Sequence, residues 1–130
     1  MNRKSLSLAA LASTLMATAL SAQAQTEIMW WHSMTAFNNE WVNTLAKQFN
    51  ESQKTYKVTP IYKGSYDESM TAAIAAFRAG NAPHILQVFE VGTATMMASK
   101  GAIVPAGKVM ADAGYKFDPN AYVAAVAGYY

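Results

Sequence analysis

The pattern of apolar and polar residues predicts strands and helices in alternation. Glu27–Trp31 and Tyr56–Tyr62 are short apolar runs, which are typical of strands. Between them, over Thr35–Asn50, apolar side chains recur every four residues and predict a helix with one stripe facing a core. The stripe has Val42 and Ala46 beside it and consists of Phe37, Trp41, Leu45 and Phe49. Pro60 cannot donate a ladder hydrogen bond, so we expect the second strand at an edge or at a bulge.

A second helix is predicted directly after the second strand. Ser65 and Glu68 have the spacing of a capping box, in which each side chain accepts a hydrogen bond from the other residue's backbone. Gly80 suits the left-handed turn after a helix, and Pro83 prevents the helix from continuing. The stripe expected to be buried consists of Met70, Ala73, Ile74 and Phe77.

The rest of the pattern predicts one more strand and three short helices. Ile85–Phe89 is mostly apolar on both faces, as in a central parallel strand covered by helices. The helices are expected over Gly92–Lys100, Lys108–Ala113 and Pro119–Ala125. Gly101 and Gly114 end the first two, and Asp118 precedes Pro119 as the cap of the third. The alternation predicts an α/β fold with a mostly parallel sheet flanked by helices.

The first residues have the three parts of a secretory signal peptide. Arg3 and Lys4 precede an apolar stretch over Leu6–Leu20, and Ala22–Ala24 is a small-x-small cleavage site. The apolar stretch is short for a helix that spans a bilayer, and polar residues follow it. We therefore expect residues 1–24 to be removed on export, with a bacterial periplasm as the destination that fits best.

Removal of the signal leaves a formally neutral chain, because the net charge of +2 comes from Arg3 and Lys4. A neutral chain lacks the basic character that favours nucleic acid. The absence of Cys excludes a disulfide framework and a thiolate metal site. The two His residues, His32 and His84, are too far apart in sequence for a local metal pair. We expect no cofactor, no metal and no nucleic-acid partner.

Three residues are candidates for a ligand site, because ligands of open α/β sheets bind at the carboxyl ends of the strands. His32 follows the first predicted strand, Tyr66 lies after the second, and Glu90 ends the third. The carboxylate of Glu90 suits a ligand with hydroxyl or amine donors, or else it stabilises the start of the next helix. Tyr66 offers a ring and a hydroxyl to a small polyol, or else it packs at the surface. For His32 we favour a buried, hydrogen-bonded role over a ligand contact.

Sequence motifs for catalysis are missing from the chain. It contains no G-x-S-x-G elbow, no Walker phosphate loop and no G-x-G-x-x-G after a strand. We therefore expect a binding protein, with no catalytic residue. The alternative is a fragment of an exported hydrolase that uses Glu90 as acid or base.

Several segments resemble the extracellular solute-binding proteins of ABC importers. They are Trp31–Met34 (WHSM), Tyr62–Tyr66 (YKGSY), Ala75–Gly101 (AAFRAGNAPHILQVFEVGTATMMASKG) and, more weakly, Ala113–Asp118 (AGYKFD). The resemblance implies a two-lobed receptor that closes on its ligand and delivers it to permease subunits in the inner membrane. It also implies that the Tyr of the KGSY turn and the Glu of the FEVG segment contact the ligand. These residues are Tyr66 and Glu90.

The same resemblance implies how much of the receptor this chain covers. Members of the family have several hundred residues, so residues 25–130 are expected to be the N-terminal part of the first lobe, without the second lobe. The apolar end at Gly128–Tyr130 also favours an interrupted chain. The implied ligand is glycerol 3-phosphate or a glycerophosphodiester, with a sugar or oligosaccharide as the alternative. The phosphate-holding residues would belong to the missing part, and we expect a monomer.

Overall fold

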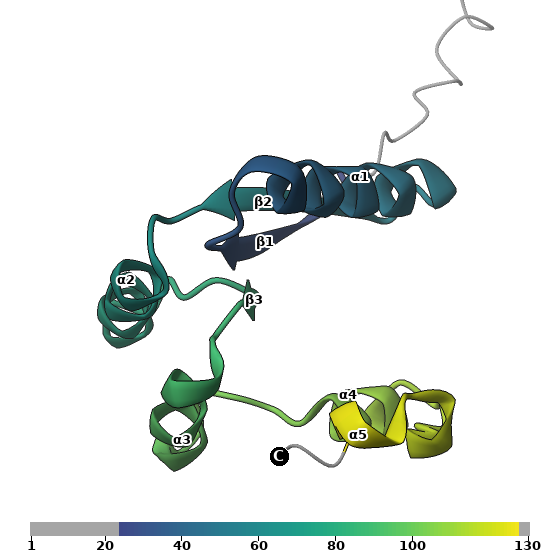
Figure 1. Cartoon of the computed structure of the whole chain (residues 1–130). Coiled ribbons are helices and arrows are strands. Elements are labelled where there is room, and N and C mark those ends of the chain that lie inside the picture. The colour runs from purple at the N-terminus through teal and green to yellow at the C-terminus, as the bar shows by residue number, and fades with distance from the viewer. Residues whose placement is uncertain (1–23, 128–130) are drawn as a thin grey trace, which may run out of the picture.

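The computed structural model describes residues 24–127 and has the predicted α/β fold. Strands and helices alternate through the first two thirds of the described chain, and short helices follow (Figure 1). The elements are β1 (Thr26–His32), α1 (Ala36–Ser52), β2 (Tyr56–Tyr62), α2 (Tyr66–Arg78), β3 (Ile85–Leu86), α3 (Glu90–Ala98), α4 (Ala106–Asp112), the 3-10 helix η1 (Pro119–Ala121) and α5 (Ala124–Ala127). The predicted signal peptide, apart from Ala24, and the residues after Ala127 lie outside the described part.

The described strands form one parallel sheet in the order β2-β1-β3. β1 and β2 pair along their whole length, from Thr26 opposite Tyr56 to His32 opposite Tyr62. β2 is thus an edge strand of this sheet, which confirms the expectation drawn from Pro60. The parallel pairing and the flanking helices are those expected for part of a lobe of a periplasmic binding protein.

The third strand differs from its prediction in length and in place. Ile85–Phe89 was expected to form a central strand, but only Ile85–Leu86 pairs with β1, at an edge of the described sheet. Within the described sheet, the central strand is β1. The apolar side chains of this segment face the helices instead, since Leu86 and Val88 line a pocket together with residues of α2 and α3.

Side chains continue the pairing of β1 with β3 beyond the two paired residues. The backbone N–H of Met29 donates to Nδ1 of His84 at 3.0 Å. At the other end, the N–H of Ser33 donates to Oε1 of Gln87, also at 3.0 Å. An imidazole and an amide thus replace backbone carbonyls at both ends of β3. The chain can therefore leave the sheet after Leu86 without stranding these donors of β1.

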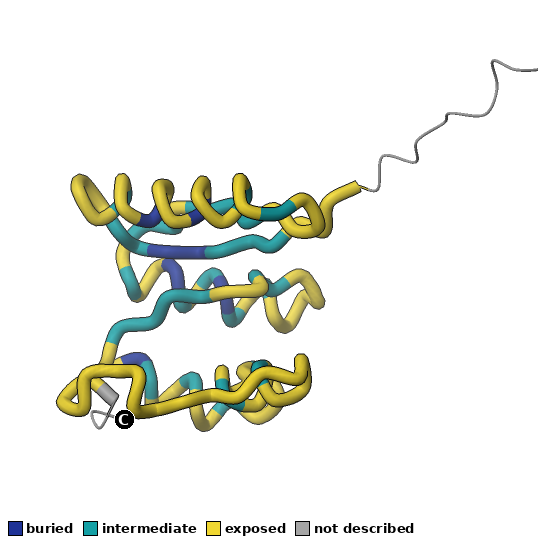
Figure 2. The backbone as a smooth tube through the Cα atoms, turned by 90° about the vertical axis from the view of Figure 1, so that its right-hand side faces the viewer, coloured by how far each residue is buried: buried dark blue, intermediate teal, exposed yellow. Residues whose placement is uncertain are grey.

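Helices lie on both faces of the sheet: in Figure 1, α2 lies to the left of the strands, and α1 lies on the other side and extends to the right. The buried positions are few, and most of them lie where these helices meet the strands (Figure 2). α1 contributes Val42 and Ala46, α2 contributes Ser69 and Ala73, and β1 contributes Trp31. The core of the described part is therefore a thin layer between each helix and the central strands.

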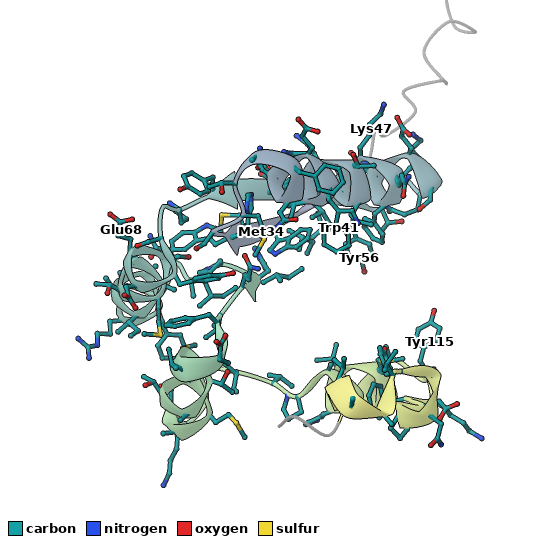
Figure 3. All side chains as sticks on the ribbon, viewed as in Figure 1. Met34, Trp41, Lys47, Tyr56, Glu68 and Tyr115 are labelled. Atoms are coloured by element: carbon teal, nitrogen blue, oxygen red, sulfur yellow. The ribbon has the colours of Figure 1, made fainter. Side chains whose placement is uncertain are left out.

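The apolar stripe of α1 is not buried as predicted. Phe37 and Trp41 are 77% and 56% exposed, whereas Val42 is 1% exposed. The cause is the position of α1, which packs mainly against the edge strand β2. The small residues beside the stripe contact the strands, and the large ones overhang them. Trp41 and Tyr56, which are labelled in Figure 3, are 56% and 45% exposed. The stripe of α2 is buried in part, because Ala73 is enclosed while Phe77 is 47% exposed.

Glycines end three of the helices in the left-handed conformation that the sequence predicted. Gly80, Gly101 and Gly114 follow α2, α3 and α4 with φ of 75°, 76° and 80°. The predicted helix after Asp118 is instead divided into η1 and α5. The Asp118 carboxylate still caps the first turn by accepting the N–H of Asn120 at 2.9 Å. Among the described helices, none combines the length and the apolar character needed to cross a bilayer.

Candidate functional site

The structure places all three sequence-predicted site residues at the carboxyl edge of the sheet. Because the strands are parallel, the chain leaves each of them at this edge and enters a helix there. His32 is the last residue of β1, Tyr66 is the first of α2 and Glu90 is the first of α3. The environments of the three residues differ, and only two of them are accessible.

Tyr66 is held by the capping box that precedes it. Oγ of Ser65 accepts the N–H of Glu68 at 3.3 Å, and Oε2 of Glu68 accepts the N–H of Ser65 at 2.7 Å. Gly64 has φ of 81°, and a Cβ at this position would overlap the carboxylate of Glu68. The turn therefore requires glycine, and the predicted capping box is confirmed. It fixes the backbone at Tyr66, whose side chain is half-buried.

Glu90 lies at a helix start and not at a strand end, which corrects the prediction. β3 ends at Leu86, three residues intervene, and Phe89 in an extended conformation caps α3. A carboxylate in the first turn is stabilised by the helix dipole. Within the described part of the chain, the exposed carboxylate of Glu90 has no hydrogen bond or ion pair. Its oxygens are available to donors from outside.

Phe89 connects these two residues and was not identified from the sequence. Its ring stacks on that of Tyr66, with centroids 5.1 Å apart and planes inclined by 22°. Because Phe89 directly precedes Glu90, the stack places the start of α2 beside the start of α3. The sequence could not predict this ring stack, because Tyr66 lies on a different helix and no local pattern links it to Phe89.

The two helix starts also approach closely at Gly92. This glycine is buried, and a Cβ there would lie 2.8 Å from Cγ1 of Val88 and 3.2 Å from Sδ of Met70. Met70 belongs to α2, so the absence of a side chain at Gly92 lets the first turn of α3 pack against α2. The packing and the ring stack together fix the arrangement of Tyr66 and Glu90.

His32 is a structural residue, as the sequence analysis favoured. Its side chain is 1% exposed, and its Nδ1 accepts the N–H of Met34 at 3.3 Å. The ring centroids of Trp30 and Tyr62 lie 6.2 Å and 6.1 Å from that of His32. Burial lowers the pKa of His32, because the charged form would lose its hydration. The neutral ring therefore serves as an acceptor within the fold.

The charges at this edge are mixed. Asp67 and Glu68 lie in the first turn of α2, and the hydrogen bond from the Ser65 backbone lowers the pKa of Glu68. Nζ of Lys63 lies 4.0 Å from the ring centroid of Trp31, a cation–π contact. No group of three or more metal-ligating His, Asp or Glu side chains occurs among residues 24–127.

The arrangement offers an aromatic hydroxyl and a free carboxylate on adjacent helix starts. Such a pair suits a small molecule with hydroxyl groups, because a carboxylate only accepts hydrogen bonds. A pocket of about 620 Å³, lined by residues of α2, β3 and α3 among others, contains neither Tyr66 nor Glu90. Glu90 is exposed and Tyr66 is half-buried, so both side chains are accessible outside this pocket.

Comparison with known proteins identifies similar sequences over most of the chain. The chain is 56% identical over 109 residues to a protein of Brucella abortus (strain 2308), which covers 84% of this chain and 25% of that protein. It is 52% identical over 112 residues to a protein of Rhizobium meliloti (strain 1021), covering 86% of this chain and 26% of that protein. A protein of Yersinia enterocolitica (serotype O:8) is 56% identical over 110 residues, with coverage of 85% and 25%.

All three relatives are named sn-glycerol-3-phosphate-binding periplasmic protein UgpB. No protein-family model matches the chain. The chain spans about a quarter of the length of the relatives that it matches. At these identities the resemblance predicted from the sequence motifs is confirmed. Over about 85% of its residues, this chain is homologous to a segment of the periplasmic sn-glycerol-3-phosphate-binding proteins.

Proposed function

We propose that this chain is part of a periplasmic receptor that captures sn-glycerol 3-phosphate, or a glycerophosphodiester, for an ABC importer. The observation that carries the proposal is the 56% identity over 109 residues to proteins named for this ligand. The segment includes both candidate residues, Tyr66 and Glu90, at adjacent helix starts. The open carboxyl edge where they lie is the usual place for a ligand in a sheet of this class.

In this proposal Glu90 and Tyr66 contact the glycerol part of the ligand. The carboxylate of Glu90 accepts hydrogen bonds from glycerol hydroxyls, and Tyr66 contributes its hydroxyl and the free part of its ring. The phosphate lies away from Glu90, because two negative groups in contact repel each other. Residues outside this chain then hold the phosphate, and the ligand favours the closed state by contacts to both lobes.

The proposed receptor is exported after cleavage near Ala24 and acts as a monomer without catalysis. Its partners are the small-molecule ligand and the permease subunits in the inner membrane, and nucleic acid is not among them. The names of the relatives, which describe periplasmic binding proteins, support the location and the absence of turnover.

Isothermal titration calorimetry with sn-glycerol 3-phosphate tests this function directly. The protein to use is the gene product purified from the periplasm at whatever length the cell makes it, called the native-length protein below. Saturable binding of sn-glycerol 3-phosphate, with weaker binding of glycerol and of maltose, is the expected result. Preferential binding of maltose or another sugar would identify a sugar receptor, and hydrolysis of a glycerophosphodiester would identify an enzyme.

The role of Glu90 is tested with the variant Glu90→Ala in the same protein. Loss of a charged hydrogen-bond acceptor is expected to weaken binding by more than about tenfold. Glu51→Ala is the matched control, because Glu51 is also an exposed glutamate but lies at the far end of α1. Equal affinities of the two variants would remove Glu90 from the site.

A further inference from the structure

We propose that Phe89 is a positioning residue for ligand binding, which holds the Tyr66 side chain beside Glu90 through the stack of the two rings. This inference rests on the proposed function. In this role Phe89 contacts Tyr66, a proposed ligand-binding residue, and does not contact the ligand itself. The centroid distance of 5.1 Å and the inclination of 22° are those of an offset aromatic stack.

The backbone of Phe89 is fixed independently of its ring. Its carbonyl accepts the N–H of Gly92 at 2.9 Å and the hydroxyl of Thr93 at 3.4 Å, so the residue is tied to the first turn of α3. The exposed Glu90 side chain begins at the next residue, one peptide unit or about 3.8 Å along the chain. Any movement of Phe89 therefore moves the attachment point of Glu90.

Tyr66 is anchored at its backbone in the same way, by the capping box of Ser65 and Glu68. The remaining freedom of Tyr66 is the rotation of its side chain, and within the described residues no hydrogen bond to its hydroxyl restricts it. The Phe89 ring is the contact that limits this rotation. One face of Tyr66 is thus occupied by Phe89, and the other face, the edge and the hydroxyl remain for the ligand.

Such pre-ordering raises affinity because the ligand does not have to immobilise the tyrosine on binding. The contribution of an aromatic pair beyond its buried area corresponds to about two- to tenfold in affinity. Phe89→Leu removes the flat ring and retains an apolar side chain, so it should weaken sn-glycerol 3-phosphate binding by this factor. Phe89→Tyr retains the ring and should restore most of the affinity.

Calorimetry on the native-length protein compares these variants with Phe77→Leu. Phe77 lies on the same helix as Tyr66, near the C-terminal end of that helix. It lines the pocket that contains neither Tyr66 nor Glu90. Phe77→Leu is the same chemical change and should leave the affinity unaltered. Thermal unfolding, measured in parallel, separates a loss of fold from a loss of affinity. Near-ultraviolet circular dichroism of the unliganded protein reports the surroundings of Tyr66 and should change more in Phe89→Leu than in Phe77→Leu.

A double-mutant cycle with Tyr66→Ala then distinguishes positioning from a general effect on the fold. If Phe89 acts through Tyr66, Phe89→Leu has no further effect on affinity once Tyr66 is removed. An equal loss in both backgrounds, or no loss in the unaltered background, overturns the inference while the proposed function stands. Absence of binding by the unaltered protein refutes the proposed function, and the inference with it.

Discussion

Substitution of Gly92 by alanine is the most direct test of the close packing between α2 and α3. An added Cβ would lie 2.8 Å from Cγ1 of Val88 and 3.2 Å from Sδ of Met70. A separation below 3.0 Å requires one of the atoms to move. The Met70 side chain is flexible and can adjust, but Val88 is β-branched and restricted at χ1. The first turn of α3 must therefore shift away from α2, or Val88 must leave its rotamer.

Two opposing terms determine the magnitude for Gly92→Ala. Replacing a helical glycine by alanine favours folding by up to about 1 kcal/mol. Forcing a methyl group into a packed site costs about 1–3 kcal/mol. The steric term wins where the obstructing atom belongs to a stiff side chain, as it does at Val88. We expect a net destabilisation of about 1 kcal/mol.

Gly107→Ala is the matched control, because Gly107 is also a helical glycine, in α4. A Cβ there would lie 3.6 Å from Cδ1 of Phe117, which is an ordinary contact. Only the favourable term remains, so this variant should be more stable than the unaltered protein by about 0.5–1 kcal/mol. The difference between the two variants isolates the steric cost at the interface of α2 and α3.

Urea unfolding of the native-length protein, followed by tryptophan fluorescence, measures both variants. The expected order of stability is Gly107→Ala, then the unaltered protein, then Gly92→Ala. A Gly92→Ala protein as stable as Gly107→Ala would show that Val88 and Met70 yield without cost. The close approach of the two helix starts would then not be a constraint on Tyr66 and Glu90.

Two further measurements test the turn before α2 and the buried histidine. Ser65→Ala removes one half of the capping box and should destabilise the protein by about 1 kcal/mol in urea unfolding, with faster amide exchange in the first turn of α2. Unchanged exchange there would contradict a capping role. Because burial lowers the pKa of His32 below its ordinary 6.5, the unfolded chain binds the proton first on acidification. The stability that His32 contributes is complete above 6.5 and is lost as the pH falls towards the lowered value, so the urea midpoint should decrease between about pH 7.5 and pH 5.5. A urea midpoint that rises as the pH falls over this range would refute the assignment of His32 as a buried, neutral residue.

The sequence predicted those features of the fold that depend on neighbours along the chain. The capping box of Ser65 and Glu68 and the left-handed Gly80 each involve interactions within one helical turn, so the residue types suffice to identify them. The edge position of β2 followed from Pro60 for the same reason, since a missing donor is a local property. These predictions needed no knowledge of which elements pack together.

The errors concern contacts between distant segments. The stripe of α1 is helical as predicted, but whether Trp41 is buried depends on which strand lies beneath it, and α1 lies over the edge strand. The apolar run at β3 predicted a long central strand. The pairing stops at Leu86: beyond it the side-chain oxygen of Gln87 accepts the N–H of Ser33, and the chain leads into α3. Periodicity cannot reveal a partner of this kind.

The corrected position of Glu90 changes what this residue can do. At the end of a strand, a carboxylate would have no helix dipole beside it. At the first position of α3, the carboxylate of Glu90 lies in the favourable field of the helix dipole, and no described hydrogen bond occupies it. The same dipole would attract a phosphate, but the adjacent carboxylate opposes it, and Asp67 adds a second negative charge at the start of α2. This distribution of charge supports the proposal that the carboxyl edge receives the hydroxyl end of glycerol 3-phosphate and not its phosphate end.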